Sequence, residues 1–159
     1  ITLLSLDLPS HACMQLRITG PASAFSDEVE LLQAVTNDGT TYLINSDSID
    51  RADLIIVQRF FPRPETERHL QKALASGKPI IYEFDDLLTD HSPDNPHREL
   101  STLCAPFVSA LLAKADGVTV STDLLASALL PRKGTVHVLP NLLDEKLWAA
   151  PPASRPTGR

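Results

Sequence analysis

One stretch of the chain, residues 52–84, constrains the fold more than any other. It opens with the aliphatic run of residues 52–59, which is typical of a strand covered by helices on both faces. A helix is predicted to begin at Pro64 and to end at Gly77, and residues 80–84 form the next predicted strand. Two strands joined through a helix by short connections lie parallel, with a right-handed crossover.

The same alternation continues on both sides of this unit. Residues 1–8 predict a first strand, residues 22–25 a short helix behind Pro21, and residues 29–35 another strand followed by a turn at residues 37–39. Towards the end of the chain, residues 117–120 and 135–139 predict two strands, with a helix over residues 123–130 capped by Thr122.

A long amphipathic helix is predicted over residues 98–115. Its apolar side is expected to carry Leu100, Leu103, Phe107, Leu111 and Leu112. Pro106 should kink this helix or split it in two. Together these elements predict an α/β fold of Rossmann-like type, a parallel sheet with helices on both faces.

Composition narrows the class of function. A net charge of -6 speaks against a nucleic-acid-binding surface, so no nucleic-acid partner is expected. The 43% hydrophobic content fits a soluble globular protein, and no apolar run is long enough to span a membrane. Cys13 and Cys104 lack the spacing of a zinc or redox motif, which favours a reduced, cytoplasmic setting and small buried thiols.

Both ends resemble cut points in a longer protein. The chain starts directly with a strand pattern, and its first residues lack the basic start and small-residue cleavage site of a signal peptide. Residues 149–159 are rich in proline and poor in hydrophobic residues, as linkers are. We therefore expect one folded domain over residues 1–148 and a linker over residues 149–159 that leads to a second domain.

Candidate binding residues follow the predicted strands, because ligands of open parallel sheets bind outside the carboxyl ends of the strands. Carboxylates accept hydrogen bonds from sugar hydroxyls, while arginine and asparagine donate them, so this set suits a polyhydroxylated ligand. The alternative is that Arg59 simply pairs with Asp85 or Asp86 and braces the sheet edge. The candidates are His11, Arg17, Gln58, Arg59, Glu83, Asp85, Asp86, Ser121, Thr122 and Asn141.

Metal binding is not favoured by the sequence. Glu83 and Asp85 have the spacing of an acidic D-x-D pair without its other features, and the five histidines share no metal-ligand spacing. His11 is either a base that meets an acceptor hydroxyl or a solvent-exposed loop histidine. No metal site is therefore expected.

Several blocks of sequence, taken in order, resemble one known family. They are residues 12–18 with Pro21, residues 52–59, residues 77–86, residues 115–122, and residues 138–141 with Asp144 and Trp148. Together they look like the N-terminal domain of GT-B glycosyltransferases of the group 1 (GT4-like) family. The fold expected from this resemblance is one half of a GT-B architecture.

The resemblance implies a retaining, metal-independent hexosyltransferase that moves a sugar from a nucleotide-sugar donor to a carbohydrate acceptor, without a further cofactor. In such enzymes the N-terminal domain holds the acceptor and a C-terminal domain binds the donor, so this chain alone is expected to be inactive. Peripheral membrane association of the full-length enzyme is compatible with this family.

Two departures from the family pattern concern the donor. Residues 8–12 contain no glycine, and Leu142 follows Pro140-Asn141 where many members have glycine. Arg17 is the candidate to bind phosphate in place of a glycine-rich loop, because a guanidinium binds phosphate bidentately. A second hypothesis from another class stays open: a non-catalytic, flavodoxin-like interaction or regulatory module of a larger protein.

Overall fold

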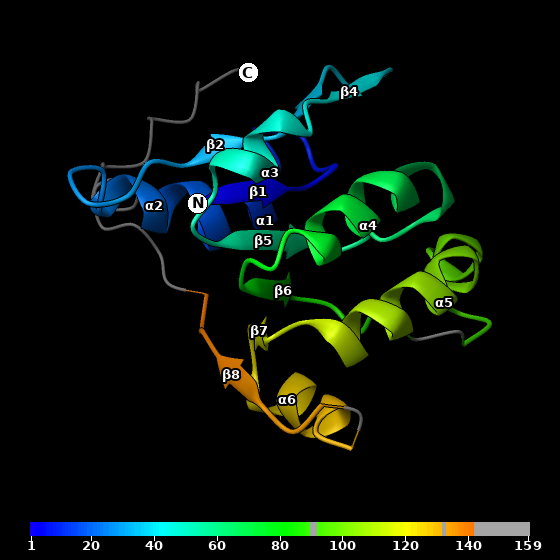
Figure 1. Ribbon diagram of the computed structural model, residues 1–159. Helices are drawn as coiled ribbons and strands as arrows, with labels where there is room; N and C mark the ends of the chain where they lie inside the picture. The colour runs from blue at the N-terminus through cyan, green and yellow to red at the C-terminus, as the bar shows by residue number, and fades with distance from the viewer. Residues whose placement is uncertain (90–91, 132, 142–159) are drawn as a thin grey trace, which may run out of the picture.

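The computed structural model describes residues 1–89, 92–131 and 133–141. Its centre is a six-stranded sheet in the order β2-β1-β5-β6-β7-β8, and every neighbouring pair in it is parallel (Figure 1). The strands are β1 Thr2–Leu4, β2 Leu32–Gln33, β5 Ile55–Gln58, β6 Ile80–Phe84, β7 Gly117–Val120 and β8 Val136–Val138. The predicted α/β, Rossmann-like class is confirmed.

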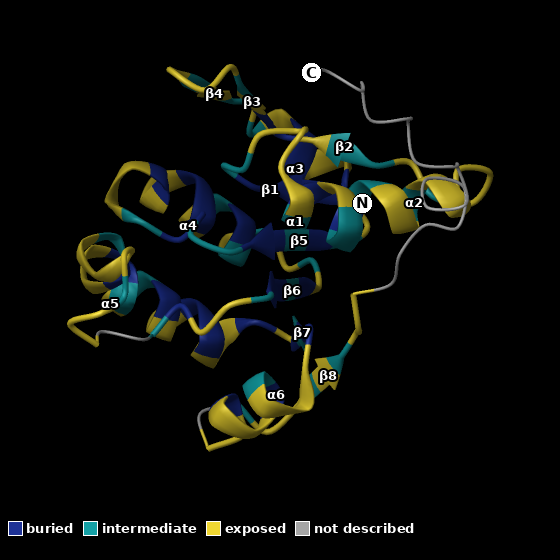
Figure 2. Ribbon diagram, turned by 180° about the vertical axis from the view of Figure 1, so that it is seen from behind, coloured by how far each residue is buried: buried dark blue, intermediate teal, exposed yellow. Residues whose placement is uncertain are grey.

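Helices cover both faces of this sheet. They are α1 Ala12–Met14, the π-helix η1 Gln15–Thr19, α2 Gly20–Ala24, α3 Asp47–Arg51, the 3₁₀-helix η2 Pro64–Thr66, α4 Glu67–Ala75, α5 Arg98–Lys114 and α6 Asp123–Leu129. Successive side chains of a strand point to opposite faces. Leu3 therefore packs against Met14 and Ile18 on one face, whereas Leu4 joins the larger core on the other. Figure 2 shows β1, β5 and β6 buried between these two layers.

Strand order reverses between β1 and β5. From β1 the chain first adds β2 on one side and then crosses to β5 on the other side. In doubly wound sheets such a switch point opens a crevice at the carboxyl ends of the two strands, and ligands bind there. The fold therefore singles out the loops after β1 and β5.

The first helical segment is longer than the sequence predicted. It begins at Ala12, not at residue 22, and runs through α1, η1 and α2. The π-turn explains why Gly20 is needed, since a Cβ atom at Gly20 would lie 2.7 Å from the Gln15 carbonyl oxygen. Pro21 then occupies the first turn of α2, where its missing N–H costs nothing.

The segment after α2 also differs from the prediction. Strand 29–35 reduces to β2, and Val35 starts an antiparallel hairpin, β3 Val35–Asn37 with β4 Tyr42–Ile44. The predicted turn is confirmed, with Gly39 at a φ of 90° and Asp38 accepting hydrogen bonds from the backbone of Thr40 and Thr41. Strand β4 and helix α3 were not predicted because both are short, with three and five residues, and α3 is also mostly polar.

Helix α5 differs from the prediction in two respects. Of the two effects predicted for Pro106, the split is absent, since α5 runs unbroken from Arg98 to Lys114 with Pro106 and Thr102 both exposed. The buried stripe is Ser101, Cys104, Val108, Leu111 and Leu112, whereas Leu103 is 50% exposed. Hydrophobicity alone favoured the leucines, but the Ser101 hydroxyl can be buried because it donates to the Leu88 carbonyl oxygen at 2.7 Å.

The later elements match their predictions closely. Helix α4, strands β6, β7 and β8, and the Thr122 cap of α6 lie where expected. Leu142, Asp144, Trp148 and the predicted linker 149–159 lie outside the described residues. Within the described part of the chain, no helix has the length and apolarity that a membrane span requires.

Candidate functional site

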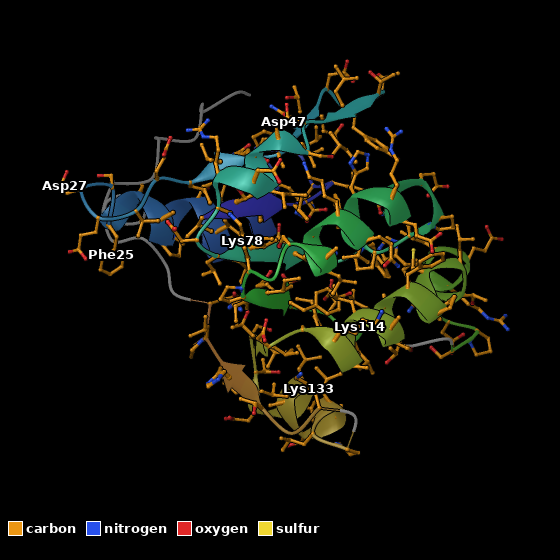
Figure 3. All side chains as sticks on the ribbon, viewed as in Figure 1. Phe25, Asp27, Asp47, Lys78, Lys114 and Lys133 are labelled. Carbon is orange, nitrogen blue, oxygen red and sulfur yellow. The ribbon has the colours of Figure 1, made fainter. Side chains whose placement is uncertain are left out.

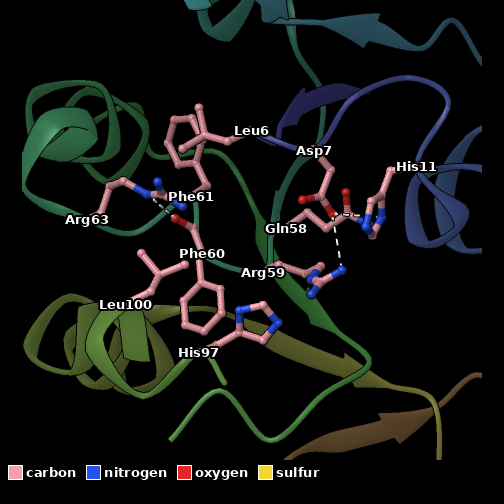
Figure 4. Close-up of a pocket in the computed structure, with 10 residues that line it drawn as sticks. All are labelled: Leu6, Asp7, His11, Gln58, Arg59, Phe60, Phe61, Arg63, His97 and Leu100. Atoms are coloured by element: carbon pink, nitrogen blue, oxygen red, sulfur yellow. Dashed lines mark hydrogen bonds and ion pairs between the residues drawn. The ribbon is translucent and has the colours of Figure 1, made fainter. Parts of the chain in front are cut away.

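A cavity of about 240 Å³ opens at the switch point between β1 and β5 (Figure 4). Its walls come from the loop after β1, from the segment after β5 and from the start of α5. The lining residues are Leu6, Asp7, His11, Gln58, Arg59, Phe60, Phe61, Arg63, His97 and Leu100. Three of the predicted site residues, His11, Gln58 and Arg59, thus face one cavity.

A larger hollow of about 560 Å³ adjoins the first, with Arg59, Phe60 and His97 in the walls of both. Asp86 and Asn95 line its other side. Small-molecule sites typically enclose about 300–1,000 Å³, so the two hollows together have the size of a binding site for a small organic ligand.

Arg59 is the electrostatic centre of this edge. Its guanidinium lies 3.5 Å from Asp7, 3.7 Å from Asp85 and 3.1 Å from Asp86, and its Nη1 donates to Cys13 Sγ at 2.8 Å. The predicted pairing of Arg59 with Asp85 or Asp86 is therefore present with both. Arg59 Nε and Asp85 Oδ1 are nevertheless buried without a hydrogen-bond partner among the described residues.

The backbone of Arg59 is strained. Its φ of 47° lies in the left-handed region, and within the described ranges it is the only non-glycine residue with a positive φ. Two hydrogen bonds hold it there: its N–H donates to the Glu83 carbonyl oxygen, and its own carbonyl accepts from the Tyr82 hydroxyl, both at 2.9 Å. Strain of this kind gathers at functional sites and persists only where the surroundings enforce it.

Arg17 belongs to a separate, buried network. Its Nε donates to Glu83 Oε1 at 2.7 Å, and Glu83 Oε2 accepts from Gln58 Nε2 at 3.0 Å. Gln58 Oε1 in turn accepts from the Ser5 hydroxyl. Burial raises the pKa of Glu83 above its usual range, against the opposing pull of Arg17 and Gln58.

This network also reaches the end of the described chain. Arg17 Nη1 donates to the Leu139 carbonyl oxygen and to Asn141 Oδ1. The Arg17 and Glu83 side chains are only 3% and 4% exposed. Arg17, Gln58, Glu83 and Asn141 therefore fasten α1–η1, β5, β6 and the segment after β8 to one another, and the charge of Arg17 is matched within the protein.

The hydroxyl groups of two predicted site residues, Ser121 and Thr122, form hydrogen bonds with the backbone. Ser121 donates to the Asp85 carbonyl oxygen at 3.1 Å, and the Thr122 hydroxyl accepts from the Leu125 N–H as the cap of α6. Each hydroxyl fixes a loop beside the rim.

His11 and Cys13 lie where the loop after β1 enters α1. His11 is exposed, its Nδ1 accepts from the Cys13 N–H at 3.3 Å, and the same nitrogen is 3.7 Å from Asp7 Oδ2. Burial, then a hydrogen bond to Asp85, raises the pKa of the Cys13 thiol to about 12. Cys104 is fully buried, as predicted, but Cys13 is only half-buried and contacts charged groups.

Sequence reasoning missed several residues of the cavity, namely Asp7, Phe60, Arg63 and His97. Asp7 was missed because the predicted strand 1–8 included it, whereas β1 ends at Leu4. Phe60 directly follows Arg59, so the rule that selected Arg59 could have found it. Arg63 donates through Nε to the Phe60 carbonyl oxygen at 2.7 Å, a contact within one tight loop. His97 had no such signal, because the fold brings it to the rim from far along the chain.

Comparison with protein-family models, with curated proteins and with solved structures finds no match for this chain.

Proposed function

We propose that this chain is the N-terminal, acceptor-binding domain of a GT-B glycosyltransferase, which transfers a hexose from a nucleotide-sugar donor to a carbohydrate acceptor. The resemblance of the ordered sequence blocks supports the family. The cavity beside Arg59 at the sheet's switch point supports the binding role, and it is the observation on which the proposal depends most.

The groups around this cavity suit a sugar. Asp7 and Asp86 are partly or largely exposed and can accept hydrogen bonds from sugar hydroxyls, while Arg59 donates between them. Phe60 lines both hollows and offers an apolar face for the C–H side of a pyranose ring. Alternating polar and apolar walls of this kind bind polyhydroxylated ligands.

Each part of the rim then has its own task. Asp7, Arg59, Asp86 and Phe60 hold the acceptor, whereas the Arg17–Glu83 pair keeps the rim in shape. His11, next to Asp7, is placed to accept a proton from an acceptor hydroxyl. The donor nucleotide-sugar binds to a second domain of the full-length enzyme, so the chain alone does not turn over. The family resemblance implies that the reaction needs no metal.

We also propose that the full-length enzyme works in the cytoplasm, in peripheral contact with a membrane that carries its acceptor. Fractionation of cells that produce the full-length protein tests both points: the protein should appear with cytoplasmic membranes and be released by salt.

The binding role can be tested on the chain itself by NMR titration with a panel of neutral and acidic oligosaccharides. Arg59→Ala and Asp86→Asn should abolish or weaken by about tenfold any binding seen in the wild type, since each removes a charge-assisted hydrogen bond. Lys114→Ala, at the far end of α5, is the matched control and should bind normally. Equal binding by all variants would assign the Arg59 cluster to structure alone.

The transferase activity needs the full-length protein and a panel of nucleotide-sugars. Release of free nucleotide together with a lengthened glycan is the expected result. A full-length protein that transfers no sugar from any of these donors, yet binds NAD, would contradict the proposal.

One observation favours the alternative, a non-catalytic interaction module. An apolar groove of about 200 Å³ lies along α1–α2 and includes Ile18, Pro21, Val29 and Leu31. At its end, Phe25 is 57% exposed and points away from the sheet (Figure 3). Exposed apolar patches often mark contacts with other proteins. Loss of a protein partner in Phe25→Ser, with sugar transfer absent, would favour this function.

A further inference from the structure

Three potential metal ligands of different chemistry converge at the entrance to α1. They are a carboxylate oxygen of Asp7, a ring nitrogen of His11 and the Sγ atom of Cys13, and all three lie within 4.8 Å of one another. Asp7 Oδ2 and His11 Nδ1 are already 3.7 Å apart. The sequence predicted no metal site, because the five histidines share no metal-ligand spacing and Cys13 and Cys104 lack the spacing of a zinc motif.

The distances suit a tetrahedral ion. Zinc binds sulfur at about 2.3 Å and nitrogen or oxygen at about 2.0–2.2 Å, which places neighbouring ligand atoms roughly 3–4 Å apart. Ligand atoms within 4.8 Å of one another need to close by at most about 1–2 Å. The exposed His11 ring can move in this way, because only one long hydrogen bond, from the Cys13 N–H, holds its Nδ1. Three protein ligands leave a fourth position for water or for a ligand atom.

The charge around these three ligands is negative, which favours the binding of a further cation. Asp7, Asp85 and Asp86 surround a single guanidinium, that of Arg59, so the local balance is negative. Arg59 neutralises these carboxylates only in part, since two of its three ion pairs are 3.5 Å or longer. Asp85 Oδ1 is buried and has only the long 3.7 Å ion pair with Arg59 Nε, without a hydrogen-bond partner among the described residues. The Asp85 carboxylate also interacts with the Cys13 thiol.

Arg59 occupies the position that a metal would take. Its Nη1 contacts the same two atoms, Cys13 Sγ at 2.8 Å and Asp7 Oδ2 at 3.5 Å, that a metal would bind. The Arg59 guanidinium can move towards Asp86, because its shortest contact with a carboxylate, 3.1 Å, is already to this more exposed residue. A metal and Arg59 Nη1 would therefore exchange at the same ligands.

We propose that Asp7, His11 and Cys13 form a binding site for a thiophilic divalent cation of the Zn²⁺ type, in competition with the Arg59 guanidinium. On binding, the Cys13 thiol loses its proton to solvent and Sγ forms a bond to the metal, while Arg59 moves to Asp86. No electron is transferred. The proposal does not depend on sugar transfer, and it concerns the chain as it stands.

Cobalt titration of the purified, reduced, metal-free chain tests the site directly. Co²⁺ in a tetrahedral site with a cysteine ligand gives thiolate-to-metal charge-transfer absorption together with intense visible bands. We expect both to saturate at one Co²⁺ per chain and to disappear when Zn²⁺ is added. Absence of both bands up to millimolar Co²⁺, with a folded protein, would overturn the proposal.

Variants then identify the ligands. Cys13→Ser should lose the charge-transfer band, and Asp7→Asn and His11→Asn should each weaken Co²⁺ binding at least tenfold. Cys104→Ser is the matched control, because it removes the chain's other thiol from a fully buried position. A band that survives in Cys13→Ser, or that is lost in a folded Cys104→Ser, would place the metal elsewhere and contradict the proposal.

The competition with Arg59 has its own readout. Arg59→Gly removes the guanidinium without straining the backbone, and it should tighten Co²⁺ binding severalfold. Weaker binding in this variant would show that Arg59 supports the site, which would contradict the competition. Circular dichroism of every variant separates loss of binding from loss of fold.

Discussion

The two rim arginines, Arg17 and Arg59, both form ion pairs with carboxylates, but the geometry of these pairs differs. Arg17 is 3% exposed and bonds one carboxylate, Glu83, at 2.7 Å, with Gln58 completing the network. Arg59 is 14% exposed and faces three carboxylates at 3.1–3.7 Å. Each arginine keeps one buried guanidinium nitrogen, Arg17 Nη2 or Arg59 Nε, without a hydrogen-bond partner among the described residues. Arg17 is therefore held by one short, buried ion pair, whereas Arg59 is held by several longer ones.

The backbone conformations at the two arginines also differ. Arg17 lies in a π-helix with φ and ψ in the ordinary helical range on both sides, whereas Arg59 is strained at a φ of 47°. A short ion pair between buried groups and a set of longer pairs around a strained backbone should respond differently to substitution. Four sets of variants test this difference.

The largest effect on the free energy of unfolding is expected at the Arg17–Glu83 ion pair. Arg17→Met or Glu83→Gln alone leaves a buried polar partner uncompensated and should lower the free energy of unfolding by about 3–5 kcal/mol. The double variant should lose much less than the sum of the two. Urea unfolding measures all three. As a control, Lys72→Met breaks an exposed pair with Asp50 and should cost less than about 1 kcal/mol. Additive single effects would show that Arg17 and Glu83 are not coupled.

The second effect concerns Cys13 in the Arg59 cluster. The thiolate is the form that reacts with iodoacetamide, and a pKa raised from 9.0 to about 12 lowers its population at pH 8 by about a thousandfold. Alkylation of Cys13 should be slow in the folded protein, accelerate as pH rises and be faster in Asp85→Asn.

Mass spectrometry follows each thiol separately in this experiment. Cys104 is fully buried, so its modification reports unfolding and provides the internal control. Folded protein in which Cys13 reacts as fast as in urea would show that neither burial nor Asp85 protects the thiol.

The third effect separates strain from charge at Arg59. Arg59→Ala keeps a side chain at positive φ, whereas Arg59→Gly relieves the strain, so the glycine variant should be more stable by about 1–2 kcal/mol. Both variants lose the guanidinium equally, which makes the alanine variant the control for charge. Equal denaturant midpoints would mean that the backbone is relaxed at this position.

The smallest effect on stability is expected at Asp86. Its side chain is 65% exposed, and an exposed ion pair contributes about 0–1 kcal/mol, so Asp86→Asn should leave the unfolding free energy almost unchanged. Carbohydrate binding should nevertheless weaken if Asp86 accepts sugar hydroxyls. A variant that loses stability as severely as Glu83→Gln would show that Asp86 fastens the fold as Glu83 does and remove the distinction.

Much of the second half of the fold could be predicted from the sequence. Strand β6, strand β7 and the Thr122 cap could be predicted because apolar period, glycine and capping residues are local signals. The rule that ligands meet the carboxyl ends of parallel strands also selected Arg59, Asp85 and Asp86 before any contact was known.

Only the tertiary structure decided which candidates brace and which face the cavity. Arg17 and Glu83 are 66 residues apart, and His97 reaches the rim from the start of α5, so no local pattern links them. The left-handed backbone of Arg59 likewise depends on Glu83 and Tyr82 of the neighbouring strand. Local propensity determines helices and strands, but the partners of a charged side chain depend on packing between segments that are distant in the chain. This packing distinguishes a residue that fastens the fold from one that faces the cavity.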